Sequence, residues 1–551
     1  MRSAWLPSMV ALGSLVVAAA CGSSSGGTTF APPGSDGGPG PSDGASSSSS
    51  GGDAPTIPTT RDDFHDPIFD TGAPTNAPTL FGAPDVGTGG PCLYEPEIGS
   101  LFPNNWLRLR WRFTTAHQEN LYEIKLVVPN EIDPLVIYTT QSGYTMTQAV
   151  WSIVTTFGAG APIHVTVRSA VVANGQLTGG PWKGSEGDVE VAPVAASGSV
   201  VYWTTSNGTV LKGFHIGDTS VQSVITTTQA ATACVACHTS TPDGLFVGLT
   251  GSTDPGNGSA AASIDLRSVN GQATRPPFLT PNALTLLQRT DQHAASFSPG
   301  HWAAGDHLAL SMLNINGSTE IVWTDLESTS PAQNTGWGVV ARTGDTRMAA
   351  SATMSHDGKT IAYTSATSVD SGTNTTDGLI YTVPWNAKAG GAATPLPGAS
   401  DASFVQYYPV FSADDRYLAF NRVPAGNKSY NDPLAELFIV PAAGQASPVR
   451  LAANDPPACT GLTSPGVTNS WPKWSPQALA SGGSTYYWLV FASTRDVPGQ
   501  GPNPGPQLYV APFVVDGSGK ITSYSALYFR NQPETEHNHT PAWDVFQLPV
   551  Q

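Results

Sequence analysis

The chain has 551 residues, which is too long for one ordinary hydrophobic core, so we expect two or more folded units. It contains 24 Lys and Arg residues and 41 Asp and Glu residues, which gives a net charge of -17. This negative charge argues against binding to nucleic acid and against electrostatic adhesion to an anionic membrane. Only 12% of the residues are charged, whereas Gly (58) and Pro (47) are abundant, which favours strands and turns over helices.

The first 20 residues have the pattern of an export signal. Arg2 supplies a positive charge, and residues 5–20 are apolar but too few for a good transmembrane helix. The sequence Ala-Ala-Ala-Cys21 at the end resembles the lipobox of bacterial lipoproteins, which implies cleavage before Cys21 and a diacylglycerol on its thiol. An ordinary signal peptide cut near Ala20 is the alternative. Because Gly22 is not Asp, the resemblance implies an outer-membrane lipoprotein, held to the membrane only by this anchor.

Residues 21–91 are rich in Gly, Ser and Pro and contain few large apolar side chains. Such a segment buries too little apolar surface to offset the entropy lost on ordering. We therefore expect a disordered tether over this whole range.

Order is expected to begin at Cys92. Leu107, Leu109, Trp111 and Phe113 alternate with Arg108, Arg110 and Arg112, which predicts a half-buried strand. Further strands are predicted at 121–128, 135–138 and 163–168, with a short amphipathic helix around 145–154. The spacing of the strands over residues 92–197 resembles a fibronectin type III or immunoglobulin β-sandwich.

An internal repeat follows from about residue 198. In each unit a Ser or Thr precedes a tight turn, and an apolar strand such as Ile361-Ala-Tyr comes after the turn. The repeated Ser or Thr positions are separated by 57, 57, 57 and 63 residues: Thr241, Ser298, Ser355, Ser412 and Ser475. The units resemble the blades of TolB-like propellers, in which a strand, a Ser-Pro-Asp-Gly turn and an apolar strand recur.

The ends of the repeat region predict six blades. Residues 539–544 begin a sixth unit that stops after one or two strands, while strands are expected at 200–203 and 210–214 before the first full unit. Strands from both ends can complete one blade and leave no free edge at the seam. The predicted fold is therefore all-β: a disordered tether, a β-sandwich, and a six-bladed propeller over residues 198–551.

One motif has the spacing of a chemical site. Cys234-Val-Ala-Cys237-His238 matches the attachment signature of c-type haem, in which two thiols bind the porphyrin and the His ligates the iron. Three alternatives stay open: a local disulfide, a soft metal ion held with His238, or buried free thiols. The motif lies at the start of a predicted propeller strand, whereas small cytochromes c surround it with helices.

The repeat register places other candidate ligands at the level of this motif. His293 and His539 align with Ala236, and Met348 and His537 align with Cys234. The resemblance to TolB-like propellers implies that this strand is innermost, so these side chains are candidates for the distal ligand of a haem iron. His539 and His293 are the first choices.

Cys92 and Cys459 remain after Cys21 and the motif are assigned. They either pair, tying the sandwich to the propeller rim, or stay as two separate thiols.

We interpret the chain as an envelope lipoprotein whose propeller is a binding scaffold, with a haem-bearing redox lipoprotein as the alternative. The expected partner is a protein, a glycan or a small ligand at the channel mouth or at rim loops such as 424–433 and 497–506. The sequence contains no hydrolase, kinase or metalloprotease motif.

Overall fold

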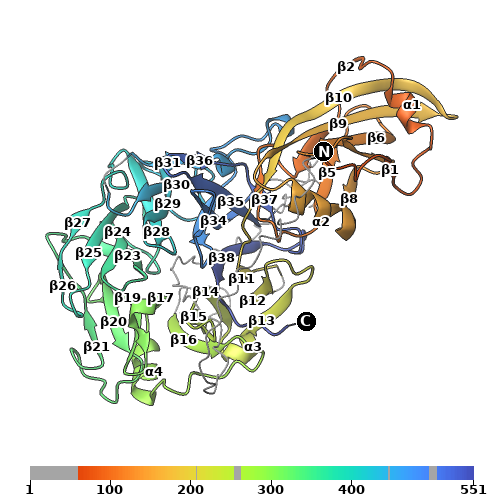
Figure 1. Ribbon diagram of the computed structural model, residues 1–551. Helices are drawn as coiled ribbons and strands as arrows, with labels where there is room; N and C mark the ends of the chain where they lie inside the picture. Colours follow the sequence, from red (N-terminus) through yellow and green to blue (C-terminus); the bar gives the residue numbers. More distant parts are fainter. Residues whose placement is uncertain (1–59, 207, 254–261, 445–446, 496–504, 551) are drawn as a thin grey trace, which may run out of the picture.

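The computed structural model describes residues 60–550 except 207, 254–261, 445–446 and 496–504. The expected signal peptide, Cys21, the tether up to residue 59 and most of the predicted rim loop 497–506 lie outside the described residues. The described part forms a β-sandwich followed by a six-bladed propeller (Figure 1), which confirms the predicted fold class. Within these ranges, none of the helices has the length and apolar character needed to cross a membrane.

The sandwich packs a seven-stranded sheet against a three-stranded sheet. The larger sheet has the order β1-β7-β6-β9-β10-β2, with β4 also paired to β10, and the smaller has the order β3-β5-β8. Trp111 from the small sheet and Ile124 from the large one share a buried core, which Trp151 of α2 completes. The elements are β1 (Ile68–Phe69), α1 (Ala77–Phe81), β2 (Gly87–Thr88), β3 (Cys92–Glu95), β4 (Leu101–Phe102), β5 (Arg110–Thr114), β6 (Leu121–Val127), β7 (Leu135–Thr139), β8 (Gly143–Thr145), α2 (Gln148–Phe157), β9 (Pro162–Ala173) and β10 (Gln176–Val191).

Residues 60–91 belong to this domain, so the predicted tether boundary at residue 91 is wrong. Strand β1 pairs with β7, and β2 pairs with β10. Leu80 and Phe81 of α1 are buried against Tyr138 and cover one face of the large sheet. A few aromatic and aliphatic side chains are enough here because they extend an existing core and do not have to build a separate one.

The propeller is a closed ring of six sheets. Its inner strands β14, β17, β23, β28, β32 and β38 contact one another in cyclic order. Strand β38, from the C-terminal end, pairs with β11, from the start of the domain, and Val200 lies opposite Trp543. Both ends of the domain therefore meet in one blade.

The strands of each blade run from the inner strand outward. They are β38 (Asn538–Asp544), β11 (Ser199–Thr204), β12 (Val210–His215) and β13 (Gln222–Thr226) in blade 1; β14 (Cys234–Ser240), β15 (Phe246–Ser252) and β16 (Ser263–Ser268) in blade 2; β17 (Gln292–Ser296), β19 (Asp306–Ile315), β20 (Ser318–Asp325) and β21 (Trp337–Val339) in blade 3; β23 (Met348–Met354), β24 (Thr360–Ala366), β25 (Leu379–Pro384) and β27 (Thr394–Pro395) in blade 4; β28 (Phe404–Phe411), β29 (Tyr417–Pro424), β30 (Glu436–Pro441) and β31 (Val449–Arg450) in blade 5; β32 (Ser470–Trp474), β34 (Ser484–Ser493), β35 (Gln507–Val515) and β36 (Ile521–Ser523) in blade 6.

Shorter elements complete the ring. They are α3 (Thr227–Ala230), α4 (Pro281–Leu287), β18 (Trp302–Ala303), β22 (Ala341–Thr343), β26 (Gly390–Ala392), β33 (Leu479–Ser481), β37 (Leu527–Tyr528), and three 3-10 helices at Pro299–His301, Ala452–Asn454 and Ala458–Thr460.

The repeated Ser or Thr residue fixes the hairpin after the inner strand. In blade 4 the Ser355 hydroxyl donates to Asp357 (2.7 Å) and accepts from the Thr360 amide (3.0 Å). Thr241 and Ser412 make the equivalent bonds in blades 2 and 5. Because the hydroxyl both donates and accepts a hydrogen bond within the turn, the repeat keeps a Ser or Thr at this position.

Each inner strand also carries a bulge at the same place. The pairing register shifts once within every inner-strand pair. In five blades the bulge contains a residue other than Gly with a positive φ: Ala294, Ser351, Tyr408, Trp471 and Thr540. Such residues strain the backbone, and bulges of this kind re-aim side chains beside functional sites.

Covalent, ionic and apolar contacts join the two domains. Cys92 forms a disulfide with Cys459, so the paired alternative is the one observed. Beside it, Arg495 of the propeller donates to Glu97 at 2.7 Å, and both side chains are buried. The ring of Trp106 packs on Phe529, with centroids 5.1 Å apart, within a core shared by both domains.

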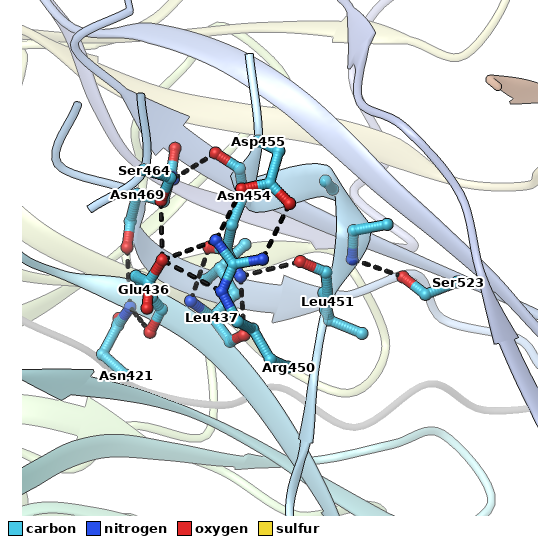
Figure 2. Close-up of polar contacts among 12 residues, drawn as sticks. Asn421, Glu436, Leu437, Arg450, Leu451, Asn454, Asp455, Ser464, Asn469 and Ser523 are labelled. Atoms are coloured by element: carbon cyan, nitrogen blue, oxygen red, sulfur yellow. Dashed lines mark hydrogen bonds and ion pairs between the residues drawn. The ribbon is translucent and has the colours of Figure 1, made fainter. Parts of the chain in front are cut away.

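A polar network anchors the segment that carries Cys459. Figure 2 shows that Arg450 bridges Glu436 and Asp455, while Asn454 is bonded to both backbone groups of Leu437. Buried Asn469 donates to the Asn454 carbonyl at 2.9 Å. Because these amides satisfy the irregular backbone between β31 and β32, the segment can hold a fixed shape against the sandwich.

We predict that replacing Arg495 by Ala lowers the free energy of unfolding by about 3–5 kcal/mol, because Glu97 would stay buried without its partner. Lys359→Ala is the matched control: its pair with Asp357 is exposed, and its loss should change the stability by less than about 1 kcal/mol. Urea denaturation followed by circular dichroism measures both variants. Equal losses would contradict the prediction.

Candidate functional site at the propeller mouth

The Cys-x-x-Cys-His motif forms most of β14, the inner strand of blade 2. Cys234 has a free thiol, 4% of the residue is exposed, and burial raises the pKa of the thiol. The local disulfide between Cys234 and Cys237, one of the alternatives that we considered, is therefore not formed. Cys237 lies in the apolar core that β14 shares with the neighbouring blades.

His238 is turned toward blade 1. Its Nε2 lies 3.0 Å from the carbonyl oxygen of Val201, which can only accept, so Nε2 carries the proton and donates. Burial lowers the pKa of His238 to about 4, so the ring is neutral near pH 7.

These residues do not fit a c-type haem. Iron ligation requires a free nitrogen lone pair, but Nε2 of His238 is committed to Val201 as a donor. Cys234 is paired with Ser252 in the β14–β15 ladder and is buried, which leaves its sulfur no open face for a porphyrin. The described residues also contain no group of three or more His, Cys, Asp or Glu side chains placed to hold a metal ion. Cys234 and His238 are thus held within the packed strands of blades 1 and 2.

The inner strands begin at one end of the ring, which we call the mouth: Cys234, Gln292, Met348, Phe404, Ser470 and Asn538. His293 lines a polar cavity of about 180 Å³ at this end, together with Asp291, Asn314, Thr319 and the loop Val369–Gly372. Two neighbouring blades thus contribute to one cavity.

His293 is the central side chain of this cavity. It is 5% exposed, and among the described residues no group is hydrogen-bonded to its ring. Burial lowers the pKa of His293 to about 4, while Asp291 and Asp370 oppose this shift. The cavity therefore offers a neutral imidazole between two carboxylates.

The bulge of blade 4 holds the loop over His293. The amide of Ser351 donates to the carbonyl of Gly372 at 3.0 Å. Gly372 has a φ of +67°, and a Cβ there would lie 3.0 Å from Cβ of His293. Only glycine allows this close approach without displacing the loop.

The other predicted residues lie near the mouth but not in the same cavity. His539 lines a second cavity of about 100 Å³ with Trp471 and Asn431, and burial lowers its pKa to about 3. Met348 begins β23 and pairs with Ala366, and the amide of His537 donates to the Ser206 hydroxyl. The four predicted distal ligands are therefore not gathered around Cys234 and His238: His293, His539, Met348 and His537.

Sequence reasoning missed the loop that closes the His293 cavity. Residues 367–378 are mostly Ser, Thr, Asp, Asn and Gly, a composition typical of any surface loop. The length of this loop, compared with the tight Asn-Gly turn at 316–317 in blade 3, was the available signal.

A buried cation lies at the seam between blades 6 and 1. Lys473 of β32 is 7% exposed, and within the described ranges it makes neither an ion pair nor a hydrogen bond. Burial lowers its pKa to about 7, against an opposing effect of Asp544. Its charge is among the influences that lower the pKa of His238.

Comparison with known proteins is limited to the fold. No family model and no curated protein matches the chain. A mutant of puromycin hydrolase is similar in structure, with 13% identity, 68% of this chain and 54% of that chain covered, and a TM-score of 0.29. This chain therefore spans about half the length of that enzyme.

Two further solved structures are similar. A quinoprotein alcohol dehydrogenase-like protein from Bacteroides thetaiotaomicron has 8% identity, covers 82% of this chain and 99% of its own, and gives a TM-score of 0.27. A GH43 endo-arabinanase from Bacillus licheniformis has 14% identity, with 52% and 96% covered and a TM-score of 0.26. The likeness concerns the propeller fold and carries nothing about activity.

We predict that the protein, co-expressed with a cytochrome c maturation system, shows no Soret band after purification. Cys234 should react with a thiol reagent only after unfolding, because its thiol is buried and its pKa is raised. Visible spectroscopy and peptide mapping by mass spectrometry test both statements. A Soret band, or rapid labelling of native Cys234, would overturn this account.

Lys473 should make stability depend on pH. Its folded pKa of about 7 lies below the ordinary value of 10.5, so the unfolded state binds more protons between these pH values. The free energy of unfolding should rise from pH 7 toward pH 10, by up to about 1.4 kcal/mol per pH unit. Lys473→Met should remove this rise, whereas Lys359→Met should retain it, as measured by denaturant titration across the range.

Proposed function

We propose that the chain is a lipid-anchored envelope protein whose propeller binds a small, neutral, polyhydroxylated ligand, such as one sugar unit of a glycan, at the mouth. One observation carries this proposal: the imidazole of His293 is buried, has no hydrogen-bond partner among the described residues, and opens on a polar cavity. A ring nitrogen that bonds to no protein group and lies at the wall of a polar cavity can exchange a hydrogen bond with water for one with a ligand hydroxyl.

The lining matches hydroxyl groups in particular. Carboxylates of Asp291 and Asp370 can accept hydrogen bonds from hydroxyls, and the neutral His293 ring can donate one and accept another. The two negative charges repel anions. A volume of about 180 Å³ leaves room for a small ligand as well as for single water molecules.

The anchor is a separate part of the proposal. The lipobox-like sequence before Cys21 and the Gly- and Ser-rich residues after it support a lipid anchor with a spacer. Such an arrangement would hold the propeller near the outer membrane while leaving its mouth open to solutes. We do not propose a haem-bearing redox role, because Cys234 and His238 do not fit the group.

We predict that His293→Ala weakens binding of the responsive sugar at least tenfold, because the ligand would lose a hydrogen bond inside a partly closed cavity. Saturation-transfer difference NMR with glucose, galactose, mannose and arabinose identifies the responsive sugar, and titration gives its affinity. His164→Ala is the matched control, since His164 lies on the exposed face of the sandwich between Asp188 and Glu186.

Wild-type protein that gives no saturation transfer to any of the four sugars would count against the proposal. Unchanged affinity in the His293→Ala variant would show that the sugar binds at a site other than the His293 cavity. Metabolic labelling with a radioactive fatty acid, lost on Cys21→Ser, tests the anchor separately.

A further inference from the structure

A second cavity lies where the sandwich meets the propeller, away from the His293 cavity. It measures about 310 Å³ and is lined by both domains. Arg108 and the polar face of α2 come from the sandwich, and Arg530 comes from the segment between β37 and β38 of the propeller. This volume lies at the lower end of the range for small-molecule sites, about 300–1,000 Å³.

The polar face of α2 follows from helical spacing. Gln148, Ser152 and Thr155 are separated by four and three residues, so they share one side of the helix and line the cavity. Trp151 lies next to this row, lines the inner wall of the same cavity, and is anchored because its Nε1 donates to the carbonyl of Trp106 at 2.9 Å. The helix is therefore fixed in rotation, with hydroxyl and amide groups toward the cavity.

The two arginines of this cavity lack counter-charges. No carboxylate of the described residues lies within ion-pair distance of Arg108 or Arg530, and neither residue has a hydrogen-bond partner there. The nearby carboxylates are already engaged: Glu95 by Arg110 at 2.6 Å, and Glu534 by Arg112 at 2.5 Å.

The electrostatics at Arg530 are unfavourable in the absence of an anion. Burial lowers the pKa of Arg530, and the positive charges of Arg110 and Arg108 lower it further, while Glu95 opposes them. Two guanidinium groups without partners thus share one hollow in a chain whose net charge is -17. Guanidinium groups bind carboxylate and phosphate oxygens through paired N–H donors.

We propose that this junction cavity binds an acidic sugar, meaning a polyhydroxylated ligand that carries a carboxylate or a phosphate. Arg108 and Arg530 would hold the oxyanion, and the side chains of Gln148, Ser152 and Thr155 would bind the hydroxyl groups. The size of the cavity favours such a ligand over a bare inorganic anion. The site is independent of the neutral-sugar site at the mouth.

Isothermal titration with glucuronate, glucose 6-phosphate, sulfate and phosphate tests the proposal on the full-length protein. At least one acidic sugar should bind at least tenfold more tightly than sulfate and phosphate do. Arg530→Gln and Arg108→Gln should each weaken that binding at least tenfold. Lys359→Gln, which removes an exposed charge of the propeller, is the control and should leave it unchanged.

Stability measurements separate binding from structure. Removing an unneutralised arginine relieves repulsion, so ligand-free Arg530→Gln protein should melt no lower than the wild type, while stabilisation by the acidic sugar should be lost. A clearly lower melting temperature of the ligand-free variant would assign Arg530 a structural role and overturn the proposal.

Other outcomes would also overturn it. Equal affinity for sulfate and the acidic sugars would leave only an unspecific oxyanion site, and no binding of either acidic sugar would remove the site. The His293→Ala variant should bind the acidic sugar normally, whereas Arg530→Gln should leave neutral-sugar binding intact. The two sites can therefore fail or succeed separately.

Discussion

Antiparallel pairing between β38 and β11 holds the propeller closed and fixes what lies around it. Ser199 is opposite Asp544, and Thr204 is opposite Asn538, so the pairing spans the whole inner strand. Since β38 belongs to blade 1, the chain leaving β37 must cross from blade 6 to blade 1, and Arg530 lies on this crossing, where it shares a cavity with the sandwich. The same pairing places His539 beside Trp471. Without this pairing, the residues that line the junction cavity and the His539 cavity would separate, and the edge of a strand would be left unpaired.

The mouth holds groups that are costly to bury. Residues with positive φ lie at the bulges of five inner strands, and the imidazoles of His293 and His539 are buried and neutral near pH 7. Elsewhere the blades follow local rules closely, with apolar middle strands and hydroxyl-capped turns. Strained and buried polar residues that cluster at one end of a regular fold are typical of functional sites. The rest of the fold is stable enough to tolerate their cost in free energy.

The ring was predictable because its signal is repeated and local. A hydroxyl residue at a nearly constant step marks each hairpin, and the same register correctly placed His293 and His539 at one level of their inner strands. Residues 60–91 escaped prediction because their few apolar side chains join a core made by later strands. The haem prediction from the motif at Cys234 failed because spacing shows only which residue types are adjacent. Haem binding also requires that the cysteine sulfurs be accessible to a porphyrin. The junction cavity combines segments near 105, 150, 218 and 530, and their proximity exists only after ring closure and domain docking.

The arginines before and within β5 show how docking changes the meaning of a pattern. Alternation of Leu107, Leu109, Trp111 and Phe113 with three arginines predicts one buried and one solvated face. In the folded protein the arginine face lies against the propeller, where Glu95 and Glu534 neutralise Arg110 and Arg112. Arg108 lies beyond the reach of these carboxylates and meets Arg530 instead. On a surface that needed only solubility, such a residue would extend into water. Here Arg108 lines a cavity beside a second guanidinium that also lacks a counter-charge. An anionic ligand that neutralises both is the simplest explanation for this arrangement.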